Sequence, residues 1–176
     1  MVPQTAGPAA APPAPSEEVD ALARELYESV QAKVVIDVER MSNIFSGIRS
    51  LSDKAQHTFV RTTATNRPKL ADALARRDWT EVHSLAHRLK GASGYIAGER
   101  VNAAAHALQK CAARLMPADA KSSVAEAAIE FATSDELVEA HSGPEPSEAL
   151  ATAQLNVLFR CLDELVGEIT ARMAGT

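Results

Sequence analysis

His87 is the residue of this sequence whose setting most favours chemistry. It lies in the stretch AHRLKGAS, residues 86–93, which the spacing of apolar residues predicts to be helical. The imidazole projects to the side of the apolar stripe of that helix and is expected to face solvent. A neutral imidazole, with an ordinary pKa of ~6.5, can act as a nucleophile at neutral pH. The stripe itself comprises Trp79, Val82, Ala86, Leu89, Ser93 and Ile96.

Lys90 and Gly91, which follow His87 on the same helix, strengthen the interpretation of His87 as a nucleophile. Gly91 lies one turn beyond His87 and leaves a clearing beside the ring, although a glycine costs about 1 kcal/mol relative to alanine inside a helix. Lys90 places an ammonium on the same side, where it can attract a phosphoryl group or a carboxylate. The pattern predicts a histidine that a partner approaches closely with an anionic group.

These residues resemble a known signature. His87, Leu89, Lys90, Gly91 and Ser93 are similar to the H-x-L-K-G-x-S motif of histidine-containing phosphotransfer (HPt) domains, and the likeness covers roughly residues 35–116. One position departs from the family, which usually has Gly-Ala after the hydrophobic residue where this chain has Ala-Gly at 97–98. Cys111, among others, also agrees with the family pattern.

The resemblance implies a function and a set of roles. His87 would accept a phosphoryl group from an aspartyl phosphate on a receiver domain and pass it to another receiver, in two-component signalling. Receiver domains of hybrid histidine kinases and response regulators would then be the partners. The receiver would supply Mg²⁺, so this chain is expected to bind no cofactor or metal and to be a phosphoryl carrier rather than an enzyme. Gln109, 22 residues after the histidine, corresponds to a glutamine that hydrogen-bonds near the imidazole in such domains; a solvated helix surface is the alternative for it.

The docking surface is expected to combine positive charge with flatness. Charge would come from the basic residues near His87, and flatness from small residues on the same helix, so that an acidic partner rim fits. For Arg76 and Arg77, the alternative to a docking role is an ordinary favourable charge at a helix terminus. The expected residues are Arg76, Arg77, Arg88, Lys90, Gly91, Gly94 and Ala97.

Three other functions compete with phosphotransfer. His83 and His87 have the i, i+4 spacing of a shared metal site, but Glu81 and His106 lie elsewhere and no further ligand is near. Ser84 and Ser93 offer no catalytic triad with His87, because Ser93 is expected to face the core and no glycine elbow or oxyanion loop accompanies either serine. A non-catalytic helical adaptor with the same fold remains the main alternative, although the retained histidine, lysine and glycine count against it.

Composition limits the class of protein. The chain has 176 residues, of which 46% are hydrophobic and only 4% aromatic, so the core must consist of aliphatic side chains in closely packed helices. A net charge of −5 and a pI near 5.5 give no reason to expect nucleic acid as a partner. No apolar run is long enough to span a membrane and no signal peptide is visible, and Cys111 and Cys161 are expected to be reduced core thiols. We expect a monomer in the cytoplasm, with the nucleus open if the source is eukaryotic.

The predicted architecture is an antiparallel four-helix bundle with an N-terminal covering helix. The stand-alone domain is expected at residues 16–176, after a disordered Ala/Pro-rich tail at 1–15, with an insert of uncertain structure at 118–146 in which Val124, Ala128 and Phe131 suggest a short helix. The expected helices begin at the cap Ser16, at Val35, at Ser52, at the cap Asp78 with Glu81 completing a capping box, near Glu99 and at Ser147. Pro68 is expected to kink or break the third of them near Arg67, and Pro117 ends the fifth.

Overall fold

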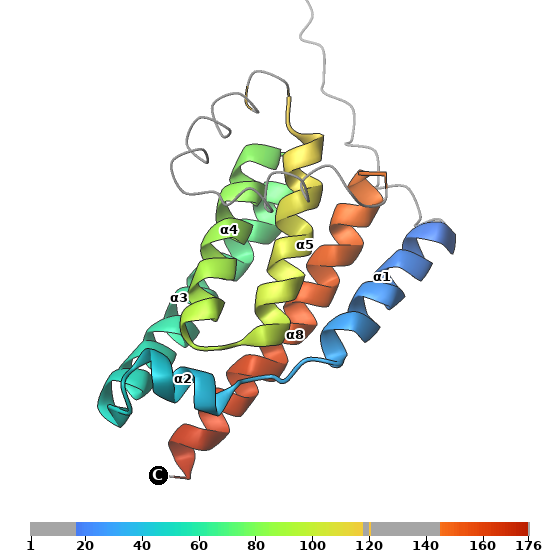
Figure 1. Ribbon diagram of the computed structural model, residues 1–176. Helices are drawn as coiled ribbons and strands as arrows, with labels where there is room; N and C mark the ends of the chain where they lie inside the picture. Colours follow the sequence, from blue (N-terminus) through green and yellow to red (C-terminus); the bar gives the residue numbers. More distant parts are fainter. Residues whose placement is uncertain (1–16, 118–119, 121–144, 176) are drawn as a thin grey trace, which may run out of the picture.

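The described part of the chain is entirely helical. The computed structural model describes residues 17–117, 120 and 145–175, and no strand occurs within these ranges. As Figure 1 shows, α3, α4, α5 and α8 lie side by side in alternating directions, which confirms the predicted antiparallel four-helix bundle. In chain order the helices are α1 (Glu17–Gln31), α2 (Val38–Ile44), α3 (Arg49–Ala75), α4 (Trp79–Tyr95), α5 (Glu99–Leu115) and α8 (Glu148–Ala174).

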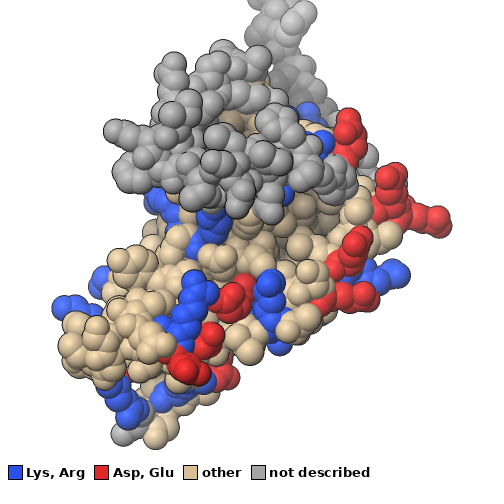
Figure 2. Space-filling model, in the orientation of Figure 1, with Lys and Arg blue, Asp and Glu red and all other residues tan. Residues whose placement is uncertain are grey.

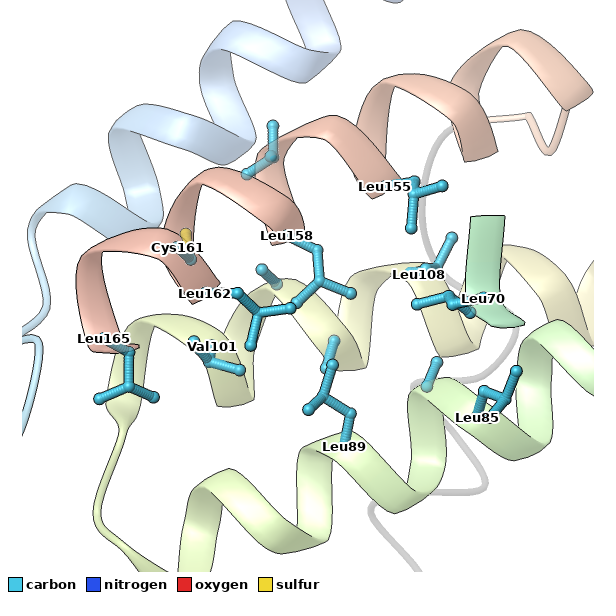
Figure 3. Packing of buried hydrophobic residues seen from close by; sticks show 14 of the residues in the cluster. Leu70, Leu85, Leu89, Val101, Leu108, Leu155, Leu158, Cys161, Leu162 and Leu165 are labelled. Atoms are coloured by element: carbon cyan, nitrogen blue, oxygen red, sulfur yellow. The ribbon is translucent and has the colours of Figure 1, made fainter. Parts of the chain in front are cut away.

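Aliphatic side chains fill the space between the four helices. In Figure 3, Leu158 and Leu162 of α8 point towards Leu89 of α4, and all three are buried. The regular seam predicted for the last helix is the reason: its residues recur at intervals of three and four and so share one face. Leu155, Leu158, Leu162, Leu165 and Ile169 of that seam are all buried, while Met173 is partly buried against the core.

The N-terminal helix covers the bundle, as predicted. α1 packs against α8 and α5, with Val19 and Val30 buried and the two leucines between them partly buried. Its end is held by Arg100 of α5, which donates to the side chain and backbone carbonyl of Gln31 and pairs with Glu164 of α8 at 2.9 Å. The apolar stripe of α1 is therefore used within the chain.

Two helix starts differ from prediction because of their caps. α2 begins at Val38 rather than Val35, since the Asp37 side chain accepts a hydrogen bond from the backbone N–H of Arg40 at 2.9 Å and so caps the helix there. α3 begins at Arg49, a turn before the predicted Ser52, because the carbonyl of Ile48 accepts from the Leu51 and Ser52 amides.

Of the kink or break expected near Arg67, the break does not occur. α3 runs through Pro68 as one helix, although proline lacks the backbone donor and crowds the preceding turn. Residues on both sides of the proline, Phe59 and Thr63 before it and Leu70 and Leu74 after it, lie on one helical face and are all buried. Packing of this continuous face against α4 and α8 holds the helix together across the proline.

The start of α4 confirms one half of the predicted cap. The Asp78 side chain accepts from the backbone N–H of Glu81 at 3.0 Å, as an N-cap should. The reciprocal half of the capping box is wrong, because the backbone N–H of Asp78 donates to the carbonyl of Ala73 at 2.9 Å. The Glu81 side chain instead pairs with Arg88, two helical turns further along α4, at 3.9 Å.

Both cysteines are free and buried, as predicted. Burial raises the pKa of Cys111 and the pKa of Cys161 to about 11, well above the ordinary thiol value of ~8.5. Since the thiolate is the reactive form, we expect both thiols of the folded protein to react with a thiol reagent at pH 8 more than about tenfold slower than in urea. Absorbance after adding dithionitrobenzoate measures this, and fast labelling without urea would contradict it.

Several predictions fall outside the described residues. They concern the tail at 1–15, the cap Ser16 and the short helix suggested within the insert. Of the insert at 118–146, only residues 120, 145 and 146 are described. Within the described ranges, none of the helices is long and apolar enough to cross a bilayer. On the face drawn in Figure 2, basic and acidic side chains are interspersed and do not gather into a single-sign surface.

Candidate functional site

His87 lies at the middle of α4 with its side chain exposed, while its neighbours Ala86 and Leu89 are buried. The helix is anchored by the opposite face, on which Val82 and Ser93 are also buried. The arrangement places the imidazole where an external group can reach it, as the sequence predicts.

Gln109 of α5 lies beside this imidazole. Because α4 and α5 are antiparallel across a short turn, Gln109 comes level with the histidine, and its Nε2 atom is 3.2 Å from Nδ1 of His87. The same Nε2 atom is 3.2 Å from Nε2 of His83, one turn earlier on α4. Gln109 therefore bridges two histidines, one more than the sequence predicts.

The two histidine rings share one face of α4. The ring centroids of His83 and His87 are 6.4 Å apart and their planes differ by 18°. His83 is half-buried, and burial lowers its pKa from the ordinary value, with the charges of His87 and Lys90 adding to the effect. At neutral pH His83 is therefore an uncharged imidazole next to the exposed one.

The backbone carbonyl of Lys90 is hydrogen-bonded to side chains of both α4 and α5. Its carbonyl accepts hydrogen bonds from Ser93 Oγ at 2.9 Å and from the side-chain amide of Asn102 on α5 at 2.8 Å. The charge of Lys90 also contributes to the lowered pKa of His83, so its ammonium acts on the His83 ring. Ser93 is fully buried and bonded to the backbone, which makes it a packing residue rather than a nucleophile.

The small residues of α4 and of the turn after it differ in their surroundings. A Cβ atom added at Gly91 would meet nothing within 4 Å, so the predicted clearing beside His87 is open space. A Cβ at Gly94 would lie 3.3 Å from the amide nitrogen of Asn102, so this glycine allows α5 to approach. Ala97 is fully buried, and its predicted place on a docking surface is wrong.

The Ala97-Gly98 order, which departs from the family, has a structural role. Ala97 takes a left-handed conformation with φ of 52°, and its carbonyl accepts from the backbone N–H of Asp37 at 2.9 Å. A Cβ at Gly98 would lie 2.7 Å from Leu165 Cδ2, closer than real contacts allow. A side chain at the second residue of the turn would force Leu165 to shift, because the turn packs directly on this α8 leucine.

The expected basic residues are less available than the sequence suggests. Arg77 pairs with Glu148 at 2.9 Å, which agrees with the alternative of helix-terminal charge, and Arg88 pairs with Glu81 at 3.9 Å. Arg76 is the C-cap of α3 and is exposed. Two of the expected basic residues, Arg77 and Arg88, therefore have acidic partners within the chain.

An apolar groove near the C-terminal end of α4 was not predicted. It lies between α3 and α4, has a volume of about 390 Å³ and includes Phe45, Leu51, Ala92 and Tyr95. Tyr95 is 69% exposed and Leu51 is 48% exposed. The sequence signal for it is the tyrosine at the solvent side of the α4 period, two turns after His87.

The metal-site alternative has little geometry behind it. Among the described residues, no three His, Cys, Asp or Glu side chains come together in a way that could hold an ion. Glu81 faces Arg88, and the atom between the histidine rings belongs to the amide of Gln109.

Comparison with protein families adds the decisive observation. The Hpt domain, as a family, matches residues 55–171, most of the chain. The chain belongs to the Hpt domain family. No curated protein and no solved structure matches it.

The Hpt match covers the whole of α4 and α5 and most of α3 and α8, so it includes every element that places His87. Hpt domains carry a phosphoryl group on a histidine in phosphorelays, interact with receiver domains and are generally not catalysts on their own. The α1 and α2 helices lie before the matched Hpt range.

Proposed function

We propose that this chain carries a phosphoryl group on His87, taking it from an aspartyl phosphate of one receiver domain and giving it to another. The observation that carries the proposal is the exposed imidazole of His87, held at Nδ1 by Gln109 beside the open space at Gly91. Family membership supports histidine phosphotransfer, and the geometry supports His87 as the histidine.

Phosphoryl transfer needs only a nucleophilic ring nitrogen and a nearby positive charge from this chain. The lone pair on Nε2 of His87 attacks phosphorus, the bond between phosphorus and the aspartyl oxygen breaks, and the carboxylate leaves with the electron pair. The Nδ1–H remains on the ring, which carries the resulting positive charge. Lys90 attracts the phosphoryl oxygens on approach. The receiver supplies Mg²⁺ and the acidic residues that bind it.

The apolar groove defined by Phe45, Leu51, Ala92 and Tyr95 suits the receiver as its occupant. Ala92 and Tyr95 of the groove lie on the same helix as His87 and within about two turns of it, so a domain-sized partner that reaches His87 can also cover the groove. Its small volume fits a weak contact that releases quickly, as a relay requires.

The test is transfer of label from a purified receiver domain that carries a radiolabelled aspartyl phosphate, with Mg²⁺ present. We expect the chain to acquire label that is lost in acid and kept in base, which marks a phosphohistidine. Binding of the receiver without any label would favour the helical adaptor, and acid-stable label would place the phosphoryl group on a hydroxyl.

Gly91→Gln is expected to slow transfer without harming the fold. The new side chain has room, because a Cβ there meets nothing within 4 Å, but it extends over the path to His87. We expect transfer from the receiver to fall at least about fivefold while the free energy of unfolding rises by about 1 kcal/mol, since glycine is poor in helices. Transfer rate and urea unfolding measure the two effects.

Gly167→Gln is the matched control for this variant. Gly167 is also an exposed helical glycine with nothing within 4 Å of an added Cβ, but it lies on α8. The control should gain the same stability and transfer at the wild-type rate. Equal rates for both variants would show that the clearing at Gly91 is not needed.

Tyr95→Ala is expected to weaken receiver binding while leaving the intrinsic reactivity of His87 intact. Truncating one exposed aromatic side chain at an interface costs about 1 kcal/mol, or roughly a fivefold higher Kd. Calorimetric titration with the unphosphorylated receiver measures it. An unchanged Kd would remove the groove from the docking surface.

A further inference from the structure

His83 has no role in the function described so far, yet it shares the amide of Gln109 with His87. One end of that amide lies 3.2 Å from Nε2 of His83 and 3.2 Å from Nδ1 of His87. The nitrogen and oxygen ends of a glutamine amide have the same shape, so the network of hydrogen bonds decides which end occupies the bridge. At the other end of the amide, Oε1 as placed accepts no hydrogen bond from the described residues. Nothing there holds the oxygen away from the bridge.

Two arrangements satisfy both histidine rings at the bridge. If NH₂ is at the bridge, it donates to both rings, so the proton of His87 must sit on Nε2 and that of His83 on Nδ1. If the oxygen is at the bridge, both rings donate to it, so the proton of His87 sits on Nδ1 and that of His83 on Nε2. Only the second arrangement leaves Nε2 of His87 with the lone pair that attacks phosphorus.

The intrinsic preference of neutral imidazole makes His83 matter. A free neutral histidine side chain favours the Nε2–H tautomer, which alone would leave His87 with a protonated Nε2. In the oxygen-bridged arrangement His87 takes the less favoured Nδ1–H tautomer, and His83 has the favoured Nε2–H tautomer. When the amide nitrogen is at the bridge, His87 has the favoured Nε2–H tautomer and His83 the less favoured Nδ1–H tautomer. The preference of His83 therefore offsets the cost of preparing His87 for attack.

We propose that His83 is a positioning residue that, through the bridging amide of Gln109, shifts His87 towards the tautomer with an unprotonated Nε2. The consequence for phosphoryl acceptance rests on the proposed function, but the coupling of the two rings does not. His83 does not touch the reacting atoms, because Gln109 stands between the two ring nitrogens.

The first test reads the tautomers directly. Nitrogen-15 NMR of the full-length protein, labelled on histidine and held at a pH where both rings are neutral, distinguishes protonated from unprotonated Nδ1 and Nε2. We expect wild-type His87 to populate the Nδ1–H tautomer substantially. In His83→Phe, which cannot donate at the bridge, we expect His87 to revert mainly to Nε2–H. His83→Ala removes the same donor without bulk and serves as the second variant.

Two further variants of this chain serve as a rescue and a control for the NMR test. In His83→Phe combined with Gln109→Glu, the bridge can present only a carboxylate oxygen, so the Nδ1–H tautomer of His87 should return. His57→Phe, which changes an exposed histidine of α3 away from the bridge, should leave the His87 spectrum unchanged. An identical His87 tautomer in wild type, His83→Phe and His83→Ala would overturn the proposal.

The second readout is phosphorylation by phosphoramidate, a small donor that needs no docking surface. We expect the rate at His87 to fall about threefold to tenfold in His83→Phe, in proportion to the lost Nδ1–H population. A tautomer shift in His83→Phe together with an unphosphorylated wild type would refute the proposed function and leave the coupling established. A normal rate together with an unshifted tautomer would refute the coupling alone.

Discussion

Replacing His87 by glutamine abolishes phosphoryl acceptance and leaves the fold intact. Glutamine has no nucleophilic nitrogen, and the position is exposed on α4, so neither the core nor the bundle depends on the ring. The expected result is no detectable label from a phosphorylated receiver, with far-ultraviolet circular dichroism and the urea midpoint within error of wild type. Autoradiography of the separated proteins measures the label.

His57→Gln is the matched control, because His57 is also an exposed histidine within the family match. It should acquire label at the wild-type rate. Retained acid-labile label on His87→Gln would mean that another histidine accepts the phosphoryl group, and the assignment of His87 would be wrong.

Replacing Leu165 by alanine is the change in the core with the largest expected effect. Leu165 is fully buried in α8 and, as Figure 3 shows, lies beside the turn that joins α4 to α5. Removing a buried leucine costs about 2–5 kcal/mol, a large part of the ~5–15 kcal/mol that stabilises a typical domain. Urea unfolding followed by circular dichroism measures the loss.

A double-mutant cycle with Gly98 separates local packing from a general loss of core. Gly98→Ala alone should destabilise the protein, because its Cβ would stand 2.7 Å from Leu165 Cδ2. In the Leu165→Ala background that space is empty, so the added methyl should cost much less. Additive free energies would show that the turn does not rest on Leu165.

Much of the fold was predictable because local rules and burial agree. The α4 and α8 stripes recur at intervals of three and four, and the caps Asp78 and Ser147 accept from the third residue of each helix. Pro68 shows where such rules fail. The local preference to break the helix is outweighed by burial of Leu70 and Leu74 on the far side of the proline, which no local pattern contains.

Part of the site was predictable for the same reason. Exposure of His87 and the clearing at Gly91 are properties of one helix: periodicity predicts the first, and the absence of a side chain on glycine predicts the second. Ala97 was misplaced because its burial depends on packing against other segments, and the groove at Tyr95 was missed because α3 forms half of it.

By itself, the sequence determined an all-helical bundle, the helix that carries His87, the face on which the imidazole lies and the nearby ammonium of Lys90. These follow from helical periodicity and from side-chain chemistry, which act within a few residues. Only the tertiary structure decided that Gln109 bridges His83 and His87, that Gly94 admits Asn102 and that the turn at Gly98 rests on Leu165. The physical reason is that such contacts depend on the relative height and separation of two packed helices. Those quantities are set by the whole core and by no single segment.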